Sequence, residues 1–369
     1  MARIVILGGG VGGTCAANRL ARLDRSAEIV VVDSHGDHLY QPHLVRVPLY
    51  GAPMKLAEDE RKLLHSRVDL IVERVEGLEL DRRCVRLESG FRLDYDGLII
   101  ATGSRLDHSR IPGAREASYN FHCRSAARNL QKALEDFKGG RILVGASALP
   151  YKFPASPFEF VLLLDEWLRK RGLREKTSLG LFAPTTTILP DGGGEKRLSA
   201  LLAERNVAFY ASFQPFSVDP SRRILRSEAS ELPFDLLVLV PPHVSQPFIR
   251  ASGLINEEGW VKVNPLTLRV RDSVYAIGDT AALPCSKTGA AARLQAHVAA
   301  MNVLTEVNGK EPGDSYGGQV TCFAETGLGQ ALTLVSSYAR SADPGEPTRV
   351  AYWKKALFGK LYFSLIRRS

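Results

Sequence analysis

The chain has 369 residues, of which 45% are hydrophobic and 24% are charged, an ordinary balance for a globular protein of two or three domains. No apolar run reaches the roughly 18 residues that a membrane-spanning helix needs. The net charge of +8 favours an anionic partner such as a membrane surface or an anionic substrate, but no motif accompanies it that would indicate nucleic-acid binding.

The cysteines and the N-terminus exclude further classes. The N-terminus leads directly into a predicted strand without a signal peptide, which predicts a protein on the cytoplasmic side. No two cysteines form a C-x-x-C pair, so neither a metal site nor a disulfide framework is predicted. The five cysteines are Cys15, Cys84, Cys123, Cys285 and Cys322.

The first predicted element is an apolar strand over residues 3–7 that runs into a G-x-G-x-x-G turn and a helix over about 12–23. Gly8 permits the tight turn, Gly10 lets the backbone approach a pyrophosphate, and Gly13 lets the helix pack on the strand. The positive end of the helix would face the phosphates. This turn, with Gly12 included, predicts a dinucleotide site.

The second predicted strand, residues 28–33, ends in an acid about 20 residues after the last glycine. In this fingerprint the carboxylate of Asp33 binds a ribose diol, and we count the adjacent Ser34 with it. Strands near 68–73, 84–87 and 97–100 continue the domain. The last of them closes on Ala101-Thr102-Gly103, so Thr102 and Gly103 join the predicted cofactor site.

A second α/β domain opens with the strand at residues 140–144. The glycine run 191–194 follows a proline rather than an apolar strand, so we interpret it as a loop leading into the next helix and not as a phosphate cradle. The other elements predicted in this domain are helices over 157–171 and 195–205 and strands over 178–183, 207–210 and 235–240.

The chain then returns to the first domain, where the apolar strand 274–277 ends in Gly278-Asp279. Asp279 would contact the ribityl or pyrophosphate end of a flavin. The two glycine motifs, in this order and separation, predict FAD. The predicted fold is α/β, with two Rossmann-like three-layer domains and a C-terminal amphipathic segment. We place an FAD domain at 1–106 and 243–312, a second domain at 107–242, and a flavin-capping, membrane-attachment region at 313–369.

The chain resembles the sulfide:quinone oxidoreductases and the flavoprotein subunit of flavocytochrome c sulfide dehydrogenase, which are related to type II NADH dehydrogenases. The resemblance covers nearly the whole length. It is most specific in LPYKFPASPFE at 149–159, LVPPH at 239–243, SKTG at 286–289, QAHVAAMN at 295–302 and Cys322-Phe323. It implies that FAD accepts two electrons from sulfide through reactive cysteines and passes them to a quinone or a cytochrome.

The second domain separates the related families. An NADH dehydrogenase would carry another G-x-G-x-x-G after residue 144, but Ser147 and Pro150 replace its second and third glycines. A side chain blocks close approach to a pyrophosphate, and proline removes an N–H donor. The sequence therefore predicts poor NADH binding.

Phe153 is a departure from the family pattern. The resemblance implies a redox cysteine at this place, and phenylalanine cannot form a persulfide or a disulfide. Cys322 matches the partner cysteine, and Cys123 matches a further cysteine before the second domain. Either these two run a modified sulfur chemistry or the family's cycle is lost. Free cysteines are also commonly buried as small apolar residues.

Two more residues take roles from the resemblance. Lys287 matches a lysine near the flavin or quinone, where a cation stabilises an anionic reduced flavin. Glu159 matches a glutamate facing the flavin, where burial would raise its pKa for proton transfer. A surface lysine and a helix-start carboxylate are the plain alternatives. Residues 40–43, in the place that lines the flavin, hold no cysteine, so we expect non-covalent FAD.

The last segment, residues 350–368, predicts an amphipathic helix at a membrane surface. Its apolar residues recur every four positions, with basic residues between them, and a helix docked on the protein's own core is the alternative. The apolar residues are Trp353, Leu357, Leu361 and Leu365, flanked by Phe358, Tyr362 and Ile366, and the cations are Lys354, Lys355, Lys360, Arg367 and Arg368.

Three functions compete on this sequence. The first is a peripheral membrane enzyme of the sulfide:quinone oxidoreductase type, acting on a small sulfur donor and a quinone or other acceptor. The second is a type II NADH:quinone dehydrogenase. The third is an electron-transfer or binding flavoprotein that has lost sulfide turnover. A homo-oligomer remains open.

Overall fold

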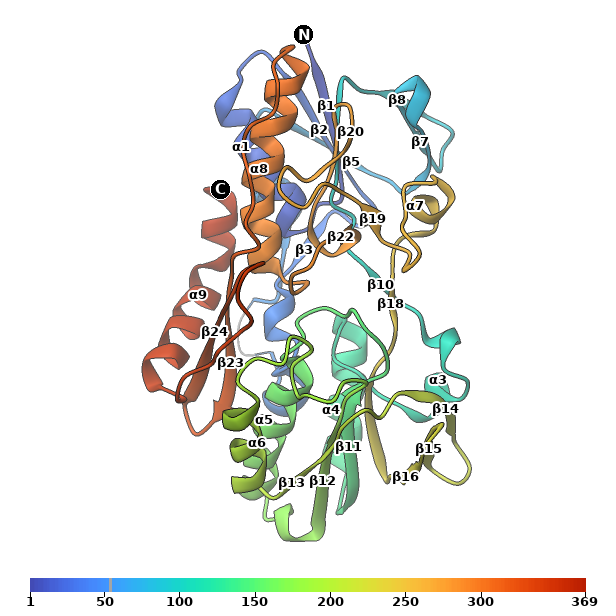
Figure 1. The fold of residues 1–369 in the computed structure, drawn as a ribbon, viewed down its shortest axis with the longest axis vertical. Helices are drawn as coiled ribbons and strands as arrows, with labels where there is room; N and C mark the ends of the chain where they lie inside the picture. Colours follow the sequence, from blue (N-terminus) through green and yellow to red (C-terminus); the bar gives the residue numbers. More distant parts are fainter. Residues whose placement is uncertain (53–54) are drawn as a thin grey trace.

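A computed structural model describes residues 1–52 and 55–369. Figure 1 shows two α/β units stacked along the long axis, with a hairpin and a helix from the C-terminal segment along one side. The predicted α/β class with two Rossmann-like sheets is confirmed.

The first unit is built on a six-stranded sheet in the order β20-β21-β9-β1-β2-β5, parallel except for the pair β20–β21. Its four inner strands are mostly apolar and buried because both faces of the sheet are covered there. The strands are β1 (Arg3–Leu7), β2 (Glu28–Asp33), β5 (Val68–Val72), β9 (Gly97–Ile100), β20 (Arg269–Arg271) and β21 (Val274–Ala276).

Helices α1 (Val11–Leu23) and α8 (Gly289–Val307) cover one face of this sheet. The other face packs against a small antiparallel sheet formed by β6 (Val75–Glu79), β7 (Cys84–Leu87) and β8 (Arg92–Asp94). Residues 84–87, predicted as a strand of this domain, thus belong to the small antiparallel sheet. Within that strand Arg86 is exposed, while Cys84, Val85 and Leu87 are buried.

The second unit has a four-stranded parallel sheet in the order β13-β12-β11-β17. Three helices cover one face, and α3 (Ala114–Ala117) with a three-stranded antiparallel sheet covers the other. The main strands are β11 (Gly140–Ala146), β12 (Thr177–Phe182), β13 (Val207–Tyr210) and β17 (Leu236–Val240); the helices are α4 (Arg124–Asp136), α5 (Ser156–Lys170) and α6 (Glu195–Glu204); the covering strands are β14 (Pro215–Asp219), β15 (Ile224–Ser227) and β16 (Glu231–Pro233).

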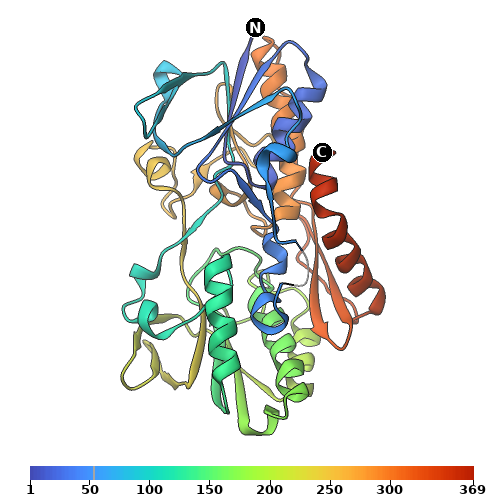
Figure 2. The same ribbon diagram turned by 180° about the vertical axis from the view of Figure 1, so that it is seen from behind.

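Two chain crossings join the units. They pair as the short antiparallel strands β10 (Arg105–Leu106) and β18 (His243–Val244), which Figures 1 and 2 show running between the upper and lower parts. The first sheet is therefore built from chain segments that precede the second unit in the sequence and from segments that follow it. The domain boundaries at 106, 242 and 312 remain our proposal.

The C-terminal segment contacts both units. The hairpin of β23 (Val320–Gly327) and β24 (Gln330–Ser336) joins the core around α5, while α9 (Arg349–Arg367) inserts Tyr362 and Ile366 into the core of the first unit. Shorter elements are β3 (Asp37–Leu39), β4 (Ala57–Asp59), β19 (Val261–Lys262), β22 (Ala281–Ala282), α2 (Val47–Tyr50) and α7 (Pro247–Ala251).

Candidate functional site

The first glycine turn is shaped for close approach from outside the protein. A Cβ on Gly8, whose φ is +102°, would lie 2.5 Å from the Ala101 carbonyl oxygen, and one on Gly13 would lie 1.8 Å from the Gly8 oxygen. These two glycines are required by the fold itself. A Cβ on Gly10 would meet no atom of residues 1–52 or 55–369 within 4 Å. Gly10 therefore faces open space at the start of α1, as a pyrophosphate cradle requires, and the turn fits the FAD that the sequence predicts.

Asp33, at the end of β2, is bound to the same turn. Its Oδ2 accepts a hydrogen bond from the Gly9 N–H at 2.8 Å, and its Oδ1 accepts from the His35 and Gly36 N–H groups at 2.8 and 3.0 Å. A carboxylate offers about four lone-pair positions, so one is left for a ribose hydroxyl. Ser34 is exposed and its hydroxyl contacts the His35 ring. Their contact with ribose stays a prediction.

The three predicted cofactor segments meet at the carboxyl ends of neighbouring strands in the first sheet. The glycine turn follows β1, Thr102 and Gly103 follow β9, and Gly278 and Asp279 follow β21, and these strands are neighbours. The Thr102 hydroxyl lies 3.5 Å from that of Thr280. Ligands of parallel α/β sheets bind outside such carboxyl ends.

Lys287 is buried behind this edge. Its ammonium donates to the backbone oxygens of Asp279 at 2.6 Å and Ala281 at 3.0 Å, and it lies 4.0 Å from the centre of the Trp260 ring. Burial lowers the pKa of Lys287 to about 8, while Asp279 favours the charged form. The plain alternative of a surface lysine was wrong. Nothing in the sequence pointed to Trp260.

The loop before α5 reaches from the second unit to this lysine. The Phe153 N–H donates to the Lys287 oxygen at 2.8 Å, and the Phe153 side chain packs in the same apolar cluster as Cys322 of β23. Burial raises the pKa of the Cys322 thiol to about 11, against an ordinary value of 9.0, although a hydrogen bond to Thr288 opposes the shift. Cys322 therefore carries a neutral thiol at pH 7.

A buried charge cluster lies beside Cys322. Glu159 of α5 pairs with Lys355 of α9, which is also 3.3 Å from Glu325 of β23, and Glu325 pairs with Arg46. Burial raises the pKa of Glu159 to about 7, with Lys355 opposing and Glu325 reinforcing the shift. The prediction that Lys355 is a surface cation was wrong, because its side chain is only 12% exposed and is neutralised by these carboxylates.

Cys123 lies in a different environment. It is the residue before α4, it is partly exposed, and its sulfur is 3.4 Å from the Ser125 hydroxyl. Its electrostatic neighbour is Lys152, whose ammonium donates to Gln41 Oε1 at 3.2 Å and also feels the Asp279 charge. Cys123 and Cys322 are both free thiols.

His122 and His243 lie near Lys152 and were not predicted as site residues. The His122 and His243 rings meet edge to face with centres 5.3 Å apart, and the Nε2 atom of each is buried with no hydrogen-bond partner among the described residues. Burial lowers the pKa of His243 to about 3, and the Lys152 charge adds to the shift. Only their positions in the sequence could have indicated a role in the site. His122 directly precedes Cys123, and His243 is the last residue of the segment 239–243 that resembles the sulfide:quinone oxidoreductases.

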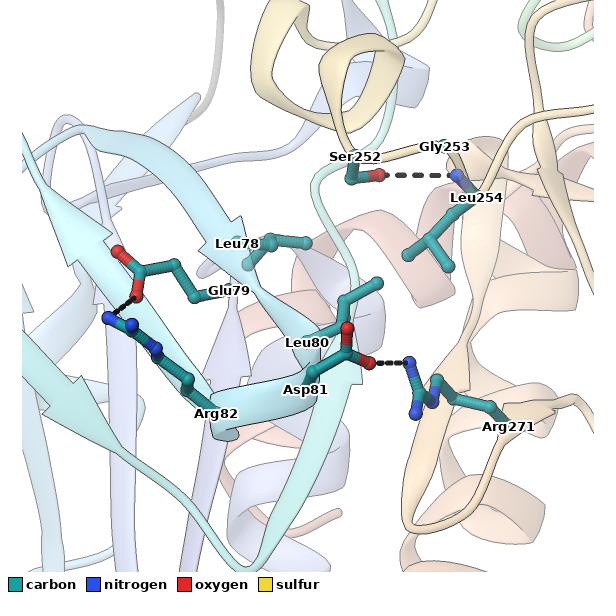
Figure 3. Close-up of a pocket in the computed structure, with 9 residues that line it drawn as sticks. All are labelled: Leu78, Glu79, Leu80, Asp81, Arg82, Ser252, Gly253, Leu254 and Arg271. Carbon is teal, nitrogen blue, oxygen red and sulfur yellow. Dashed lines mark hydrogen bonds and ion pairs between the residues drawn. The ribbon is translucent and has the colours of Figure 1, made fainter.

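A surface cavity of about 550 Å³ lies elsewhere, between the turn after β6 and the end of α7 (Figure 3). The Asp81 carboxylate and the Arg271 guanidinium form an ion pair across it at 3.1 Å. None of the predicted site residues lines it. The remaining lining residues are Leu78, Glu79, Leu80, Arg82, Ser252, Gly253 and Leu254.

Comparison with known proteins agrees with this geometry. Residues 2–149 match the pyridine nucleotide-disulphide oxidoreductase family. The chain is 28% identical over 359 residues to the mitochondrial sulfide:quinone oxidoreductase of Mus musculus, covering 93% of this chain and 79% of that protein. The X-ray structure of the sulfide:quinone oxidoreductase of Aquifex aeolicus has a TM-score of 0.91 at 22% identity and covers 100% of this chain and 92% of that one.

A second kind of relative is also similar. The alternative NAD(P)H-ubiquinone oxidoreductase C1 of Arabidopsis thaliana is 28% identical over 229 residues, 55% of this chain and 43% of that protein. Fold, glycine motifs and relatives together define an FAD-dependent flavoprotein oxidoreductase. Within that class, the chain is similar over most of its length to sulfide:quinone oxidoreductases.

Proposed function

We propose that this enzyme passes two electrons from sulfide or a related sulfur donor through non-covalent FAD to a quinone, with Cys322 as the reacting thiol. The observation that carries the proposal is the position of Cys322, packed near Phe153 and beside the buried pair Glu159–Lys355. FAD, when bound, supplies the two-electron chemistry. Gly10, Thr102, Gly103 and Asp279 would hold it at the sheet edge.

The protein's own groups supply the proton chemistry. With FAD as the two-electron oxidant, the Cys322 thiol and sulfide would form a persulfide at Cys322: one S–S bond would form, two S–H bonds would break, and two electrons and two protons would pass to FAD. The thiol must lose its proton for this bond to form, and burial opposes that loss. Glu159 has a pKa of about 7, so its carboxyl group can both accept and return a proton near neutral pH. Lys355 holds the carboxylate form in place. We assign Glu159 as the proton acceptor and Lys355 as its positioning residue.

Phe153 leaves a second candidate function open, that of an electron-transfer or binding flavoprotein that has lost sulfide turnover. Without a thiol at 153, Cys322 has no sulfur partner on that loop, and a flavoprotein without sulfide turnover is a coherent outcome. Anaerobic titration with sulfide and with NADH, followed by flavin absorbance, separates the candidates. Bleaching by sulfide supports the proposal, bleaching by NADH supports a dehydrogenase, and bleaching by neither supports a flavoprotein without sulfide turnover.

We predict that NADH and NADPH reduce the flavin poorly. The Ser147 N–H and hydroxyl both bond to the Val240 oxygen at 3.0 Å, so neither points to a phosphate. The glycine loop before α6 is covered by the segment around Ala342, so it offers no open cradle for a phosphate. Asp191 accepts a hydrogen bond from the Ala342 N–H at 2.9 Å, and a Cβ on Gly193 would lie 1.5 Å from the Ala342 oxygen. In stopped-flow mixing we expect rates well below 1 per second. Bleaching within the usual enzyme range of about 1–1000 per second would contradict this.

We also propose that α9 binds a membrane surface through its outward face. Trp353, Leu357 and Leu361 are 66%, 57% and 44% exposed and lie about one turn apart. Lys354 and Lys360 are exposed beside them. An apolar stripe with an aromatic residue and flanking cations suits the headgroup region of an anionic bilayer.

Across residues 1–52 and 55–369, no helix combines the length and apolar character needed to cross a bilayer.

Replacing Trp353, Leu357 and Leu361 together by serine should lower binding to anionic vesicles about 100-fold or more. Burying each such side chain contributes roughly 1.5–3 kcal/mol. Vesicle flotation measures the loss. The matched control replaces Phe91, Phe216 and Leu266, which are 55%, 51% and 51% exposed on other elements. Equal recovery of the two triple variants would contradict a membrane role for α9.

A further inference from the structure

The C-terminal helix is hydrogen-bonded to the cofactor turn through buried side chains. The Tyr362 hydroxyl of α9 lies 2.8 Å from His38 Nε2 of β3, and His38 Nδ1 lies 3.0 Å from both the Gly9 carbonyl oxygen and Glu60 Oε2. Thr14 of α1 bonds to the other Glu60 oxygen. The four side chains are at most 3% exposed. No step of the proposed reaction uses this network.

The partners of His38 fix the direction of the hydrogen bonds at Nδ1. A carbonyl oxygen and a carboxylate only accept, so Nδ1 carries the hydrogen and donates it to Gly9 and Glu60. Nε2 is paired with the Tyr362 hydroxyl, which can either donate or accept a hydrogen bond. Removing that hydroxyl would leave a buried ring nitrogen without its partner, which weakens the hold on the ring.

The Gly9 carbonyl controls what the turn presents to a ligand. It belongs to the same planar trans peptide as the Gly10 N–H, so the two groups point in opposite directions. The carbonyl points inward to His38, and the Gly9 N–H is itself held by Asp33 at 2.8 Å. The Gly10 N–H is thereby directed outward, on the side where Gly10 has open space.

Additional contacts tie α9 to the helix that begins at this turn. Asn18 of α1 donates to the Ile366 oxygen at 3.2 Å, and Arg22 donates to the Arg367 oxygen at 2.8 Å. The Tyr362 ring also packs on Tyr40, with centres 4.3 Å apart. The outward face of α9 described above lies on the other side of the helix, so docking and membrane contact do not compete.

We propose that Tyr362 is a positioning residue of the FAD site. Through His38 it fixes the Gly9–Gly10 peptide, so that the Gly10 N–H faces the pyrophosphate, and docking of α9 is thereby coupled to FAD occupancy. The proposal rests on the FAD site proposed above. The coupling is reciprocal: if the docked helix raises FAD affinity, FAD stabilises the docked helix by the same factor.

The test is FAD affinity in Tyr362→Phe, measured by flavin fluorescence while FAD is titrated into flavin-stripped protein. We expect about tenfold weaker binding, or 1.4 kcal/mol. Tyr352→Phe, on the same helix and with no hydrogen-bond partner in the described structure, is the matched control and should bind as wild type. In a His38→Gln background, Tyr362→Phe should change affinity less than twofold, because its route to the turn is already cut.

Hydrogen exchange supplies a second readout. FAD should slow amide exchange in α9 of the wild type and do so less in Tyr362→Phe. Equal FAD affinity of Tyr362→Phe and wild type overturns the coupling, even if the variant is less stable in urea. A wild-type chain that binds no FAD overturns the proposed function itself, so the two failures are distinguishable.

Discussion

Replacing Gly10 by valine is expected to weaken FAD binding at least 100-fold while leaving the stability of the flavin-free protein unchanged. The backbone at Gly10 is extended, with φ −78° and ψ −175°, and a Cβ there meets no atom of the described chain within 4 Å. Valine adopts such a conformation without strain. The added side chain instead occupies the space through which a pyrophosphate approaches. A 100-fold loss corresponds to about 2.8 kcal/mol of binding free energy.

The measurement pairs two titrations of each protein, FAD binding by fluorescence and urea unfolding without FAD. Unfolding should agree with wild type to within about 0.5 kcal/mol. Gly345→Val is the control, since Gly345 is also exposed and has open space around its Cβ position. FAD affinity retained in Gly10→Val would show that the cofactor does not approach this turn, and the assignment of the glycine motif would be wrong.

Gly10 also illustrates what the sequence could establish. The glycine turn, the ATG segment and the Gly-Asp motif were each predicted from a strand and the residues that end it. Because parallel strands share one carboxyl edge, local patterns were enough to predict that these segments meet. The bounds of β2 and β13 agreed with the prediction, and α1 began one residue earlier, at Val11.

The contacts that shape the site required the folded chain. The partners of Lys355 are Glu159 and Glu325, which are 196 and 30 residues away in the chain, so a basic residue on an amphipathic segment gave no sign of burial. The periodicity of α9 predicted one broad apolar face. The helix in fact presents two, one docked through Tyr362 and Ile366 and one exposed through Trp353, Leu357 and Leu361.

The same limit applies to His38. A histidine on a short strand has no pattern of its own, and its role depends on Tyr362, 324 residues later. Side-chain networks of this kind are set by tertiary packing rather than by local sequence. Sequence motifs therefore did not predict the His38–Tyr362 hydrogen bond.

Replacing Cys322 by serine is expected to lower sulfide-dependent flavin reduction at least about 100-fold, because the thiol is the proposed nucleophile and a hydroxyl cannot replace it near neutral pH. Anaerobic stopped-flow absorbance measures the rate. Cys84→Ser, at a buried thiol on β7, should react as wild type. Retained activity in Cys322→Ser would refute the redox role. If Phe153→Cys oxidises sulfide and the wild type does not, the natural protein has lost sulfide turnover. It would then be an electron-transfer or binding flavoprotein.

The pH dependence of Cys322 provides a check that does not require turnover. The raised pKa of about 11 means that the thiolate fraction at pH 7 is about 10⁻⁴ and grows tenfold per pH unit. Alkylation of Cys322 by iodoacetamide, followed by mass spectrometry, should therefore keep accelerating between pH 9 and 11, where an ordinary thiol levels off near 9. The unfolded chain loses this proton first, so the stabilising contribution of the neutral thiol is complete below pH 9 and is lost as the pH rises towards 11. Alkylation that levels off below pH 9 would show that the buried thiol is already activated, and that Glu159 is not needed to accept its proton.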